Sequence, residues 1–563
     1  MNLRFHLHFA YPTTLLAALL AATLAGCAAW APAPTGPVRV KVLAINDFHG
    51  NLKPPTGGIR VRDPKDATKT INVEAGGAEH LATAVAQARA RNPNHIFVAA
   101  GDLVGATPLL SALFHDEPTI ASLGLMGLEV TAVGNHEFDH GKDELLRQQR
   151  GGCHPKDGCK GPQPFTGARF KYLAASTVDT ASGKTILPAY HVKRFQGIPV
   201  AFIGLTLKST PSIVVPSGVA GLQFLDEAET VNRLVPELRG QGIEAIVVLI
   251  HEGGVPTGDY NECPGISGPI VDIVHKLDKA VDLVVSGHTH RAYNCRIDGR
   301  LVTSADKYGT VLSEIDLTLD PKTGDVMESR ADNLIVRNDV YAKDAAQTRL
   351  IASYEALAAP LAKRVVGRLA ANLIRDENAA GEIPIGQVVA DAQLAATQGA
   401  ADGAAQIALM NPGGLRAPLV RSGDGQVRYE ELFAVQPFSN NLVTLTFTGE
   451  QLLRVLEQQW HNQPRPRILQ VSSGFTYAWD ASRPTGQRVV PGSAMLNGRP
   501  IQPDARYRVT VNSFLATGGD GFAILRQGME PRTGMMDVDA LEKYFQNNPL
   551  VAPATAARIQ KAP

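Results

Sequence analysis

Five apolar runs in the first half of the chain each end directly in side chains that can bind a metal ion or a proton. "VRVKVLAIND" leads to Asp47 and His49, and "HIFVAAGD" leads to Asp102. The other runs are "EVTAVGNHE", "IEAIVVLIHEGG" and "VDLVVSGHTH", which lead to Asn135 and His136, to His251, and to His288 and His290. Continuous apolar runs of this kind are typical of strands that are covered on both faces.

Helix-like segments separate several of these runs. Two of them are "GAEHLATAVAQARAR" and "DEAETVNRLVPELRGQG". Strands interleaved with helices predict a buried, largely mixed α/β sheet, and ligands of such a sheet gather beyond its strand ends. Any one aspartate or histidine at such a place could be a helix cap or a hydrogen-bonded structural residue. Five clusters at equivalent places together predict a metal site.

The ligand types indicate which metals the site would take. Asp, Asn and His without a nearby thiolate favour Zn²⁺, Mn²⁺, Co²⁺ or Fe²⁺ over Ca²⁺. The candidates outnumber the ligands of one tetrahedral ion, so we expect two divalent ions that share a carboxylate. Asp102 stands alone in its motif and in the middle of the series, which makes it the natural bridge. Two ions about 3.5–4 Å apart can clamp a phosphate and activate a water.

Length and charge limit the function classes. The chain has 563 residues, with 44% hydrophobic and 19% charged residues, which suits a globular protein of two to four domains. It has 54 Lys+Arg and 54 Asp+Glu, so no overall charge favours a nucleic-acid polymer as partner.

The N-terminal segment predicts export. Its apolar run "TTLLAALLAATLAGC" is too short for a spanning helix and is typical of a signal peptide. The end of residues 1–27 resembles the bacterial lipoprotein box, in which Cys27 would be lipidated; an ordinary signal cleaved near Ala29 is the alternative. Residues 28–37 are rich in Pro and Ala and would form a tether. We therefore expect a lipoprotein anchored to a membrane, in the periplasm or outer membrane of a Gram-negative bacterium.

The remaining cysteines form an even set in a compartment that permits disulfides. Sequence proximity favours Cys153–Cys159, which closes "CHPKDGC", and leaves Cys263–Cys295. The alternative is a zinc knuckle of Cys153, His154 and Cys159, which lacks a fourth ligand nearby.

The motifs also resemble those of a known family. "NDFHG", "GDLVG", "GNHEFDHG", "IHEGG" and "GHTH" are similar, in order, to the motifs of the calcineurin-like metallophosphoesterases, and "GNHEFDHG" resembles the 5′-nucleotidase branch. The resemblance implies a four-layer α/β/β/α domain over residues 38–340. It implies that the ligands of a first ion are Asp47, His49, Asp102 and His290. The ligands of a second ion would be Asp102, Asn135, His251 and His288. It also implies a catalytic dyad of His136 and Asp139, whereas Glu137 and His140 are interpreted as structural.

The second half of the chain changes character. "KDAAQTRLIASYEALAAPLAKRVV" has helical spacing and no glycine, which predicts a linker helix within residues 341–364. Residues 365–548 resemble the α+β substrate-binding domain of 5′-nucleotidases, and residues 549–563 are expected to form a tail. The resemblance gives base stacking to Phe438 and Phe514, ribose binding to Asp520, base and phosphate contacts to Asn411 and Arg416, and a candidate phosphate contact to Arg375. Alternatively, the two phenylalanines are core residues and "GGDG" is only a turn.

Together these features predict a secreted, lipid-anchored dimetal phosphohydrolase that removes phosphate from nucleotides. Other activities that share the two-metal core are a 2′,3′-cyclic-nucleotide phosphodiesterase, a UDP-sugar diphosphatase and a thiosulfohydrolase-like enzyme. A different class would be a nucleotide-binding lipoprotein whose catalytic core has decayed, and this alternative predicts missing ligands. None of the expected ligands is missing from the motifs.

Overall fold

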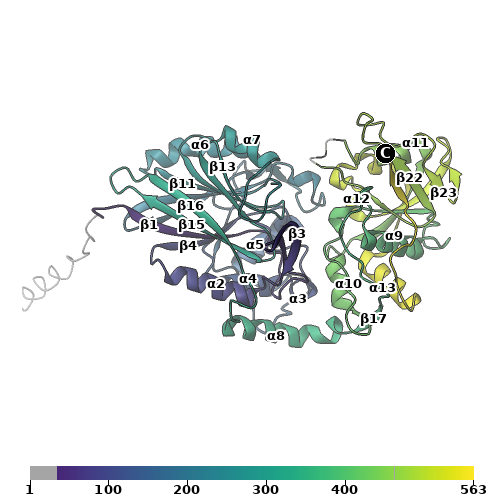
Figure 1. Ribbon diagram of the computed structural model, residues 1–563, viewed down its shortest axis with the longest axis horizontal. Helices are drawn as coiled ribbons and strands as arrows, with labels where there is room; N and C mark the ends of the chain where they lie inside the picture. The colour runs from purple at the N-terminus through teal and green to yellow at the C-terminus, as the bar shows by residue number, and fades with distance from the viewer. Residues whose placement is uncertain (1–33, 462, 464, 563) are drawn as a thin grey trace, which may run out of the picture.

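The computed structural model describes residues 34–461, 463 and 465–562, and it shows two lobes joined by one long helix, α8 (Figure 1). The N-terminal lobe holds the strands between Val38 and Ile335, and the C-terminal lobe holds those between Val365 and Lys561. Cys27, the residue expected to carry the lipid, lies outside the described residues.

Two six-stranded mixed sheets face each other in the N-terminal lobe. The first has the order β16 (Val326–Ile335), β15 (Val311–Leu319), β1 (Val38–Ile45), β4 (His95–Ala99), β5 (Val130–Ala132) and β6 (Lys171–Leu173). The second has the order β13 (Ala292–Ile297), β14 (Arg300–Ala305), β12 (Val281–Ser286), β11 (Ala245–His251), β9 (Ile198–Thr206) and β8 (Tyr190–Phe195). The central strands of both sheets are parallel, so their carboxyl ends lie at the same edge.

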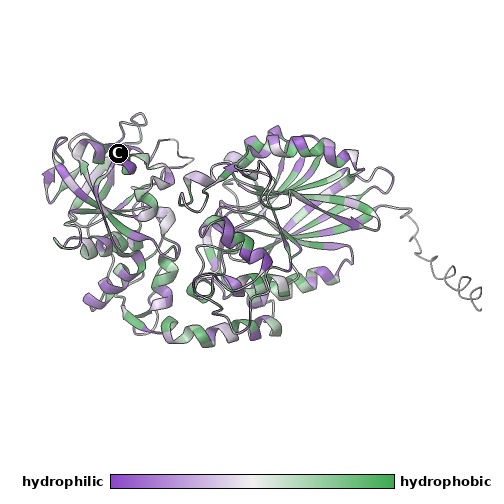
Figure 2. Ribbon diagram, turned by 180° about the vertical axis from the view of Figure 1, so that it is seen from behind, coloured by the Kyte–Doolittle hydropathy of each residue, from purple (hydrophilic) through white to green (hydrophobic). Residues whose placement is uncertain are grey.

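Strand β1 shows why the apolar runs are continuous. Val40 and Val42 pack into the core between the two sheets, whereas Leu43 and Ile45 pack into the core on the opposite face. Both faces of the strand are therefore covered along its second half, which is entirely apolar. Nearer its start Arg39 is exposed, and the buried Lys41 is paired with Glu314 and Asp316. In Figure 2 the strands of the two sheets are mostly hydrophobic, in contrast to the mixed surfaces of the helices around them.

Helices cover the outer face of each sheet. The first sheet packs against α2 (Ala78–Ala90) and α4 (Glu117–Leu125), and the second packs against α6 (Glu227–Gly240) and α7 (Pro269–Lys276). Helix α6 begins where the Asp226 carboxylate accepts a hydrogen bond from the Glu229 backbone N–H, which satisfies one of the free donors of the first turn. The four-layer α/β/β/α arrangement expected from the motifs is confirmed.

The predicted linker helix is α8 (Ala345–Ala362), a little shorter than the expected range of 341–364. The Asp344 carboxylate caps it by accepting hydrogen bonds from the N–H groups of Ala346 and Gln347, both at 2.9 Å. Tyr354 of α8 packs edge-on against Phe114, with 4.9 Å between ring centroids. Both rings belong to an apolar cluster that continues into the C-terminal lobe, so α8 is packed on both lobes rather than free in solvent.

The C-terminal lobe is built on a five-stranded sheet with helices against it. Its strands have the order β21 (Gln470–Val471), β18 (Ile407–Met410), β25 (Arg506–Asn512), β20 (Asn441–Thr448) and β26 (Met529–Met536). Its principal helices are α9 (Pro384–Thr397), α10 (Tyr429–Val435), α11 (Gly449–Glu457) and α13 (Asp537–Asn547).

The expectation that residues 549–563 form a tail is wrong. Strand β27 (Ile559–Lys561) pairs in parallel with β22 (Phe475–Trp479), and Val551 pairs with Leu369. The Arg558 guanidinium donates to the Asp391 carboxylate at 2.7 and 2.8 Å. These contacts come from residues far apart in the chain, so no local pattern around residue 550 indicates them.

Candidate metal centre

The five motifs converge at the carboxyl edge of the two sheets. Five of the expected ligands adopt left-handed backbone conformations, with φ between 44° and 69°: Asp47, His49, Asp102, His288 and His290. This conformation is uncommon for residues other than glycine, and it clusters at functional sites because it aims a side chain that an extended strand would turn away. The backbone after β1, β4 and β12 thus turns these side chains inward, whereas His251 is the last residue of β11 and Asn135 has a right-handed backbone.

The first group consists of Asp47, His49 and His290. The Nε2 atoms of His49 and His290 lie 3.1 Å apart, and His290 Nε2 lies 3.2 Å from Asp47 Oδ1. Asp47 Oδ1 is buried and has no hydrogen-bond partner. Burial places the pKa of His290 well below its ordinary value, so its imidazole stays neutral and able to act as a ligand.

The second group consists of Asp102, His251 and His288. His251 Nε2 lies 2.9 Å from Asp102 Oδ2, yet the His251 nitrogen makes no hydrogen bond, and Asn135 Oδ1 is also buried without a partner. Burial lowers the pKa of His288 to about 3. Asp47 Oδ1, Asn135 Oδ1 and His251 Nε2 are thus buried without hydrogen-bond partners. Such atoms, in a cluster of Asp, Asn and His side chains, fit the binding of divalent cations.

Asp102 connects the two groups. Its Oδ2 atom lies 2.9 Å from His251 Nε2 and 3.7 Å from His49 Nε2, while its Oδ1 accepts a hydrogen bond from the His136 backbone N–H at 2.9 Å. Gly134 makes this approach possible, because a Cβ at that position would lie 2.1 Å from Asp102 Oδ1.

Hydrogen bonds behind the ligands orient them. His49 Nδ1 lies 2.8 Å from the Gly105 carbonyl oxygen, and His251 Nδ1 lies 2.7 Å from the Ala100 carbonyl oxygen. A carbonyl can only accept, so each Nδ1 carries the hydrogen and each Nε2 is left to face the site. Burial lowers the pKa of His251, but the nearby Asp102 and Asp47 carboxylates raise it to about 10, so a cation bound here would replace a proton.

Glu137 supports the loops of the site. Its buried carboxylate accepts hydrogen bonds from the backbone N–H groups of Gly134 at 2.6 Å, Leu103 at 2.8 Å and Asp102 at 3.0 Å. It therefore joins the loop after β4 to the loop after β5. Glu137 was expected to be structural, but its motif did not indicate these three bonds. His140, the other residue interpreted as structural, is exposed.

His136 and Asp139 form the expected contact, with 2.7 Å between His136 Nδ1 and Asp139 Oδ2. Burial lowers the pKa of His136, but the carboxylates of Asp139 and Asp102 outweigh it, and the net pKa is raised. His136 also lies close enough to His49 and Asp102 to act as a ligand. The geometry therefore allows two roles for His136, one in proton transfer and one in metal binding.

Two residues of the C-terminal lobe reach this edge. The Phe438 ring stacks on the His136 ring with 5.7 Å between centroids, and the Arg416 guanidinium lies over Phe438 at 5.8 Å. Arg416 Nε and Nη2 are buried without hydrogen-bond partners. Arg375 lies beside it and donates from Nη1 to the Arg416 carbonyl oxygen at 3.1 Å.

Asn411 and Asp520 contact each other in the C-terminal lobe. Asn411 Nδ2 donates to Asp520 Oδ2 at 2.7 Å, and Arg467 donates to Asp520 Oδ1. Both carboxylate oxygens of Asp520 therefore have partners within the chain. Phe514 lies over Gly519, where a Cβ would come within 2.5 Å of the ring. Sequence reasoning missed Arg467, since nothing in "QPRPR" links it to a carboxylate 53 residues away.

The cysteines are paired as Cys153–Cys159 and Cys263–Cys295, with Cα–Cα distances of 4.6 and 5.1 Å. The alternative zinc knuckle that uses Cys153 and Cys159 is wrong, because their sulfur atoms are bonded to each other.

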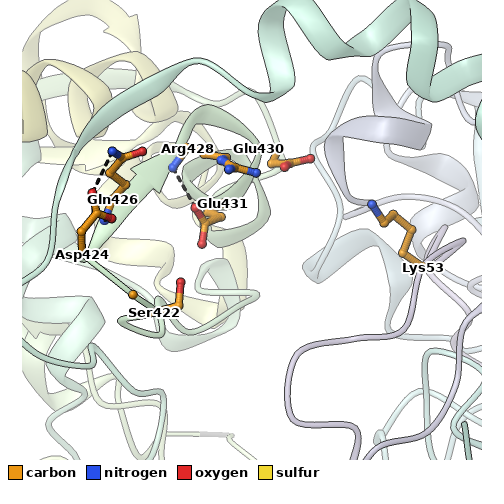
Figure 3. Close-up of a pocket in the computed structure, with 8 residues that line it drawn as sticks. Lys53, Ser422, Asp424, Gln426, Arg428, Glu430 and Glu431 are labelled. Carbon is orange, nitrogen blue, oxygen red and sulfur yellow. Dashed lines mark hydrogen bonds between the residues drawn. The ribbon is translucent and has the colours of Figure 1, made fainter.

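A polar pocket between the lobes lies apart from these groups (Figure 3). It is lined by Lys53 of the N-terminal lobe and by residues 422–431 of the C-terminal lobe. Gln426 Nε2 donates to Asp424 Oδ2 at 2.8 Å, whereas the Lys53 ammonium donates to Glu355, outside the pocket, at 2.7 Å. None of the expected site residues within the described part of the chain lines it.

Comparison with known proteins agrees with this geometry. Residues 40–292 match the model of the calcineurin-like phosphoesterases, and residues 365–527 match the model of the 5′-nucleotidase C-terminal domain. The chain thus has the fold of a metal-dependent phosphoric ester hydrolase. It belongs to the family that combines these two domains, the 5′-nucleotidase family.

Two curated relatives are similar over most of the chain. A cell wall protein of Listeria monocytogenes is 32% identical over 90% of this chain and 67% of its own length. Endonuclease YhcR of Bacillus subtilis is 33% identical over 92% of this chain, but the chain spans only 40% of that relative's length. Among solved structures, a 5′-nucleotidase precursor from Thermus thermophilus has a TM-score of 0.75 at 27% identity, covering 93% of this chain and 99% of the other.

Proposed function

We propose that this chain is an exported two-metal phosphohydrolase that removes phosphate from nucleotides. The observation that carries the proposal is the contact between the lobes, in which Phe438 stacks on His136 at the edge of the candidate metal centre and Arg416 lies over Phe438. The metal centre, which would hydrolyse the phosphate ester, and the residues that would bind the nucleoside would thereby contact the same substrate molecule. In this proposal residues 38–340 are the catalytic domain and residues 365–548 are the core of the substrate domain.

The metal-binding roles follow from the two groups. We assign Asp47, His49, Asp102 and His290 to one ion, and Asp102, Asn135, His251 and His288 to the other. Divalent ions held there would supply Lewis acidity to the phosphate and would acidify a water. Their identity among Mn²⁺, Zn²⁺, Co²⁺ and Fe²⁺ is left open by these ligand types.

His136 would act on the leaving oxygen. Asp139 holds its Nδ1 and raises its pKa, which keeps a proton available on the opposite nitrogen. A protonated imidazole beside the phosphate would stabilise the developing charge and protonate the departing oxygen.

Arg416 would bind the phosphate. A buried guanidinium with unpartnered nitrogens is costly without an anion, and a phosphate can accept two parallel hydrogen bonds from it. Phe438 and Phe514 would stack on the base, and Asn411 would contact it. Asp520 would bind the ribose, which requires the hydroxyls to replace Arg467 or Asn411 as its partner.

A second candidate function is hydrolysis of a substrate with two phosphate groups, such as a UDP-sugar. Lys307, Arg375 and Arg416 all lie near Tyr308, and together their charges lower its pKa against the opposing effect of burial. Such a group of cations favours more negative charge than one phosphate carries. The relative named as an endonuclease makes phosphodiesters a class to test as well.

The test is a substrate panel on the purified chain with added Mn²⁺. It contains AMP, 2′,3′-cyclic AMP, UDP-glucose, bis(p-nitrophenyl) phosphate and a short oligonucleotide. We expect AMP to give the highest kcat/KM, and Arg416→Ala to lower it by about 10²-fold or more, as for loss of a charged transition-state contact. Arg421→Ala, on the exposed surface of the same lobe, is the control. Faster cleavage of UDP-glucose or of the diesters than of AMP would replace the proposal with one of its alternatives.

We also propose that the chain is exported and held at a membrane through Cys27. The signal-like N-terminus and the two disulfides support export. Among the described residues, none of the helices has the length and apolar character that a membrane crossing needs. Cys27→Ser should move the protein out of the membrane fraction or block its processing, and unchanged attachment would contradict acylation at Cys27.

A further inference from the structure

A second cluster of metal-binding side chains lies in the N-terminal lobe, apart from the residues assigned above. The loop closed by Cys153–Cys159 carries His154 and Asp157, and it lies against His115, which follows α3 (Leu109–Ala112). The His115 and His154 rings are stacked, with 3.8 Å between centroids and 10° between planes. Residues from two separate segments therefore meet at one point. The lone pair of an imidazole nitrogen lies in the plane of its ring, so one of the two rings would have to turn for both to bind the same ion.

The contacts of His115 resemble those of a ligand in the candidate metal centre. His115 Nε2 is buried and lies 3.0 Å from Asp157 Oδ2, but this nitrogen makes no hydrogen bond. His251 Nε2 has the same relation to Asp102 Oδ2, at 2.9 Å and also without a hydrogen bond. In both pairs the nitrogen and the oxygen are close but not aligned with each other, as expected when both face a third atom.

The third side chain completes a ligand set. One ligand atom each from His115, His154 and Asp157 lies within 4.8 Å of the others. His154 Nδ1 lies 3.9 Å from Asp157 Oδ2 and accepts a hydrogen bond from the Asp157 backbone N–H at 3.2 Å, a bond that a cation bound at this nitrogen would replace. The side chain of Asp157 is 40% exposed, so the cluster can be reached from solvent.

We propose that His115, His154 and Asp157 form a third divalent-cation site, suited to Zn²⁺ with water at its remaining position. Two imidazoles and one carboxylate are a ligand set that zinc accepts in proteins. The disulfide removes both thiols of the loop, so the ligands are nitrogen and oxygen only. A cation would displace the exposed Lys160 ammonium, which lies 3.1 Å from Asp157 Oδ2.

The position of the site indicates a structural role. Phe114 precedes His115 and packs on Tyr354 of α8, the helix between the lobes. A cation would fasten the disulfide loop to the segment that supports this helix. We therefore expect the site to stabilise the N-terminal lobe without taking part in hydrolysis.

The experiment counts zinc in the full mature chain after removal of metal by a chelator, reloading with Zn²⁺ and desalting. Elemental analysis should show that three variants bind about one zinc ion per chain less than the wild type. These variants are His115→Asn, His154→Asn and Asp157→Asn. His275→Asn, on the exposed face of α7, is the matched control and should keep the wild-type content. The rate of p-nitrophenyl phosphate hydrolysis, measured separately, should stay within about twofold of the wild type in every variant. Loss of an ion from the candidate metal centre would instead abolish this hydrolysis.

Thermal unfolding gives a second measurement. Added Zn²⁺ should raise the Tm of the chelated wild type more than that of Asp157→Asn, because a ligand bound only to the folded state stabilises it. Asp157 is exposed, so this variant is expected to fold even if the histidine variants do not. Equal zinc contents and equal Tm shifts in the wild type and Asp157→Asn would overturn the proposal.

Discussion

The two carboxylate oxygens of Asp102 face different parts of the candidate metal centre. Oδ2 lies near the Nε2 atoms of His251 and His49, one from each ligand group, and Oδ1 holds the backbone of His136. A single residue thus joins both groups to the dyad. At this scale, substitutions of individual side chains separate metal binding from proton transfer.

Asp102→Asn should lose bound metal and activity together. The amide is similar in shape, but it lacks the charge that two cations would share, and its nitrogen cannot act as a ligand. Elemental analysis and phosphate release from AMP measure the two losses. Asp339→Asn, which changes an exposed residue paired with Arg337, is the control. If Asp102→Asn keeps two ions and ordinary turnover, Asp102 does not bridge them.

His136→Ala should keep its metal content and lower kcat by about 10²–10⁴-fold, the usual range for a general acid or a charge-stabilising group. The structure makes this test informative, because His136 also lies within ligand distance of His49 and Asp102. Elemental analysis decides between the roles. A variant that loses an ion would show that His136 is a ligand.

At the scale of elements, β12 carries a titratable residue that has no part in the site. Burial raises the pKa of Asp282 to about 8, and the nearby Asp325 adds to the effect, although a hydrogen bond from the Ile246 N–H opposes it. An unfolded aspartate has a pKa of about 3.9, so the folded state binds a proton more tightly than the unfolded state. The stability that this proton provides is complete below about pH 4 and is lost as the pH rises to about 8.

Asp282→Asn should therefore make the protein less sensitive to pH. Its stability relative to the wild type should rise between pH 5 and pH 8 by on the order of 4 kcal/mol, at about 1.4 kcal/mol per pH unit over this window. Denaturant unfolding at both pH values measures the difference. Asp272→Asn, exposed on α7, should follow the wild type. A constant difference between Asp282→Asn and the wild type at all pH values would contradict the raised pKa.

At the scale of the whole molecule, the function that we propose depends on two lobes meeting. The proposed metal ligands lie on the N-terminal lobe, whereas Phe514 lies on the C-terminal lobe. Stacking on an aromatic ring is worth about 1–3 kcal/mol per base. Phe514→Ala should therefore raise KM for AMP by about ten- to a hundredfold, at 1.4 kcal/mol per factor of ten.

A substrate without a base provides the comparison. Hydrolysis of p-nitrophenyl phosphate should hardly change in Phe514→Ala, and Phe514→Tyr should restore the KM for AMP because it keeps an aromatic ring. Both substrates are measured on the same enzyme preparation. Equal losses on AMP and on p-nitrophenyl phosphate would show that Phe514 supports the fold instead of binding the base.

Local patterns predicted the parts of this protein that depend on neighbours in the chain. The segments expected as helices are α2, α6 and α8, and the apolar runs are β1, β4, β5, β11 and β12. Helical spacing and strand burial act over a few residues, so a short stretch carries their signal. Pairings over long separations carried no such signal, as the contact between Arg467 and Asp520 and the place of β27 in the sheet illustrate.

The sequence by itself determined the residue types of the candidate centre and their location at or just after the ends of buried strands, because a strand covered on both faces favours apolar side chains along its length. The tertiary structure decided which of these side chains share a ligand group and which nitrogen of each histidine faces inward. It also decided that Phe438 stacks on His136, 302 residues earlier in the chain. Such contacts depend on left-handed backbone turns and on the packing of two lobes, which only the folded chain brings together.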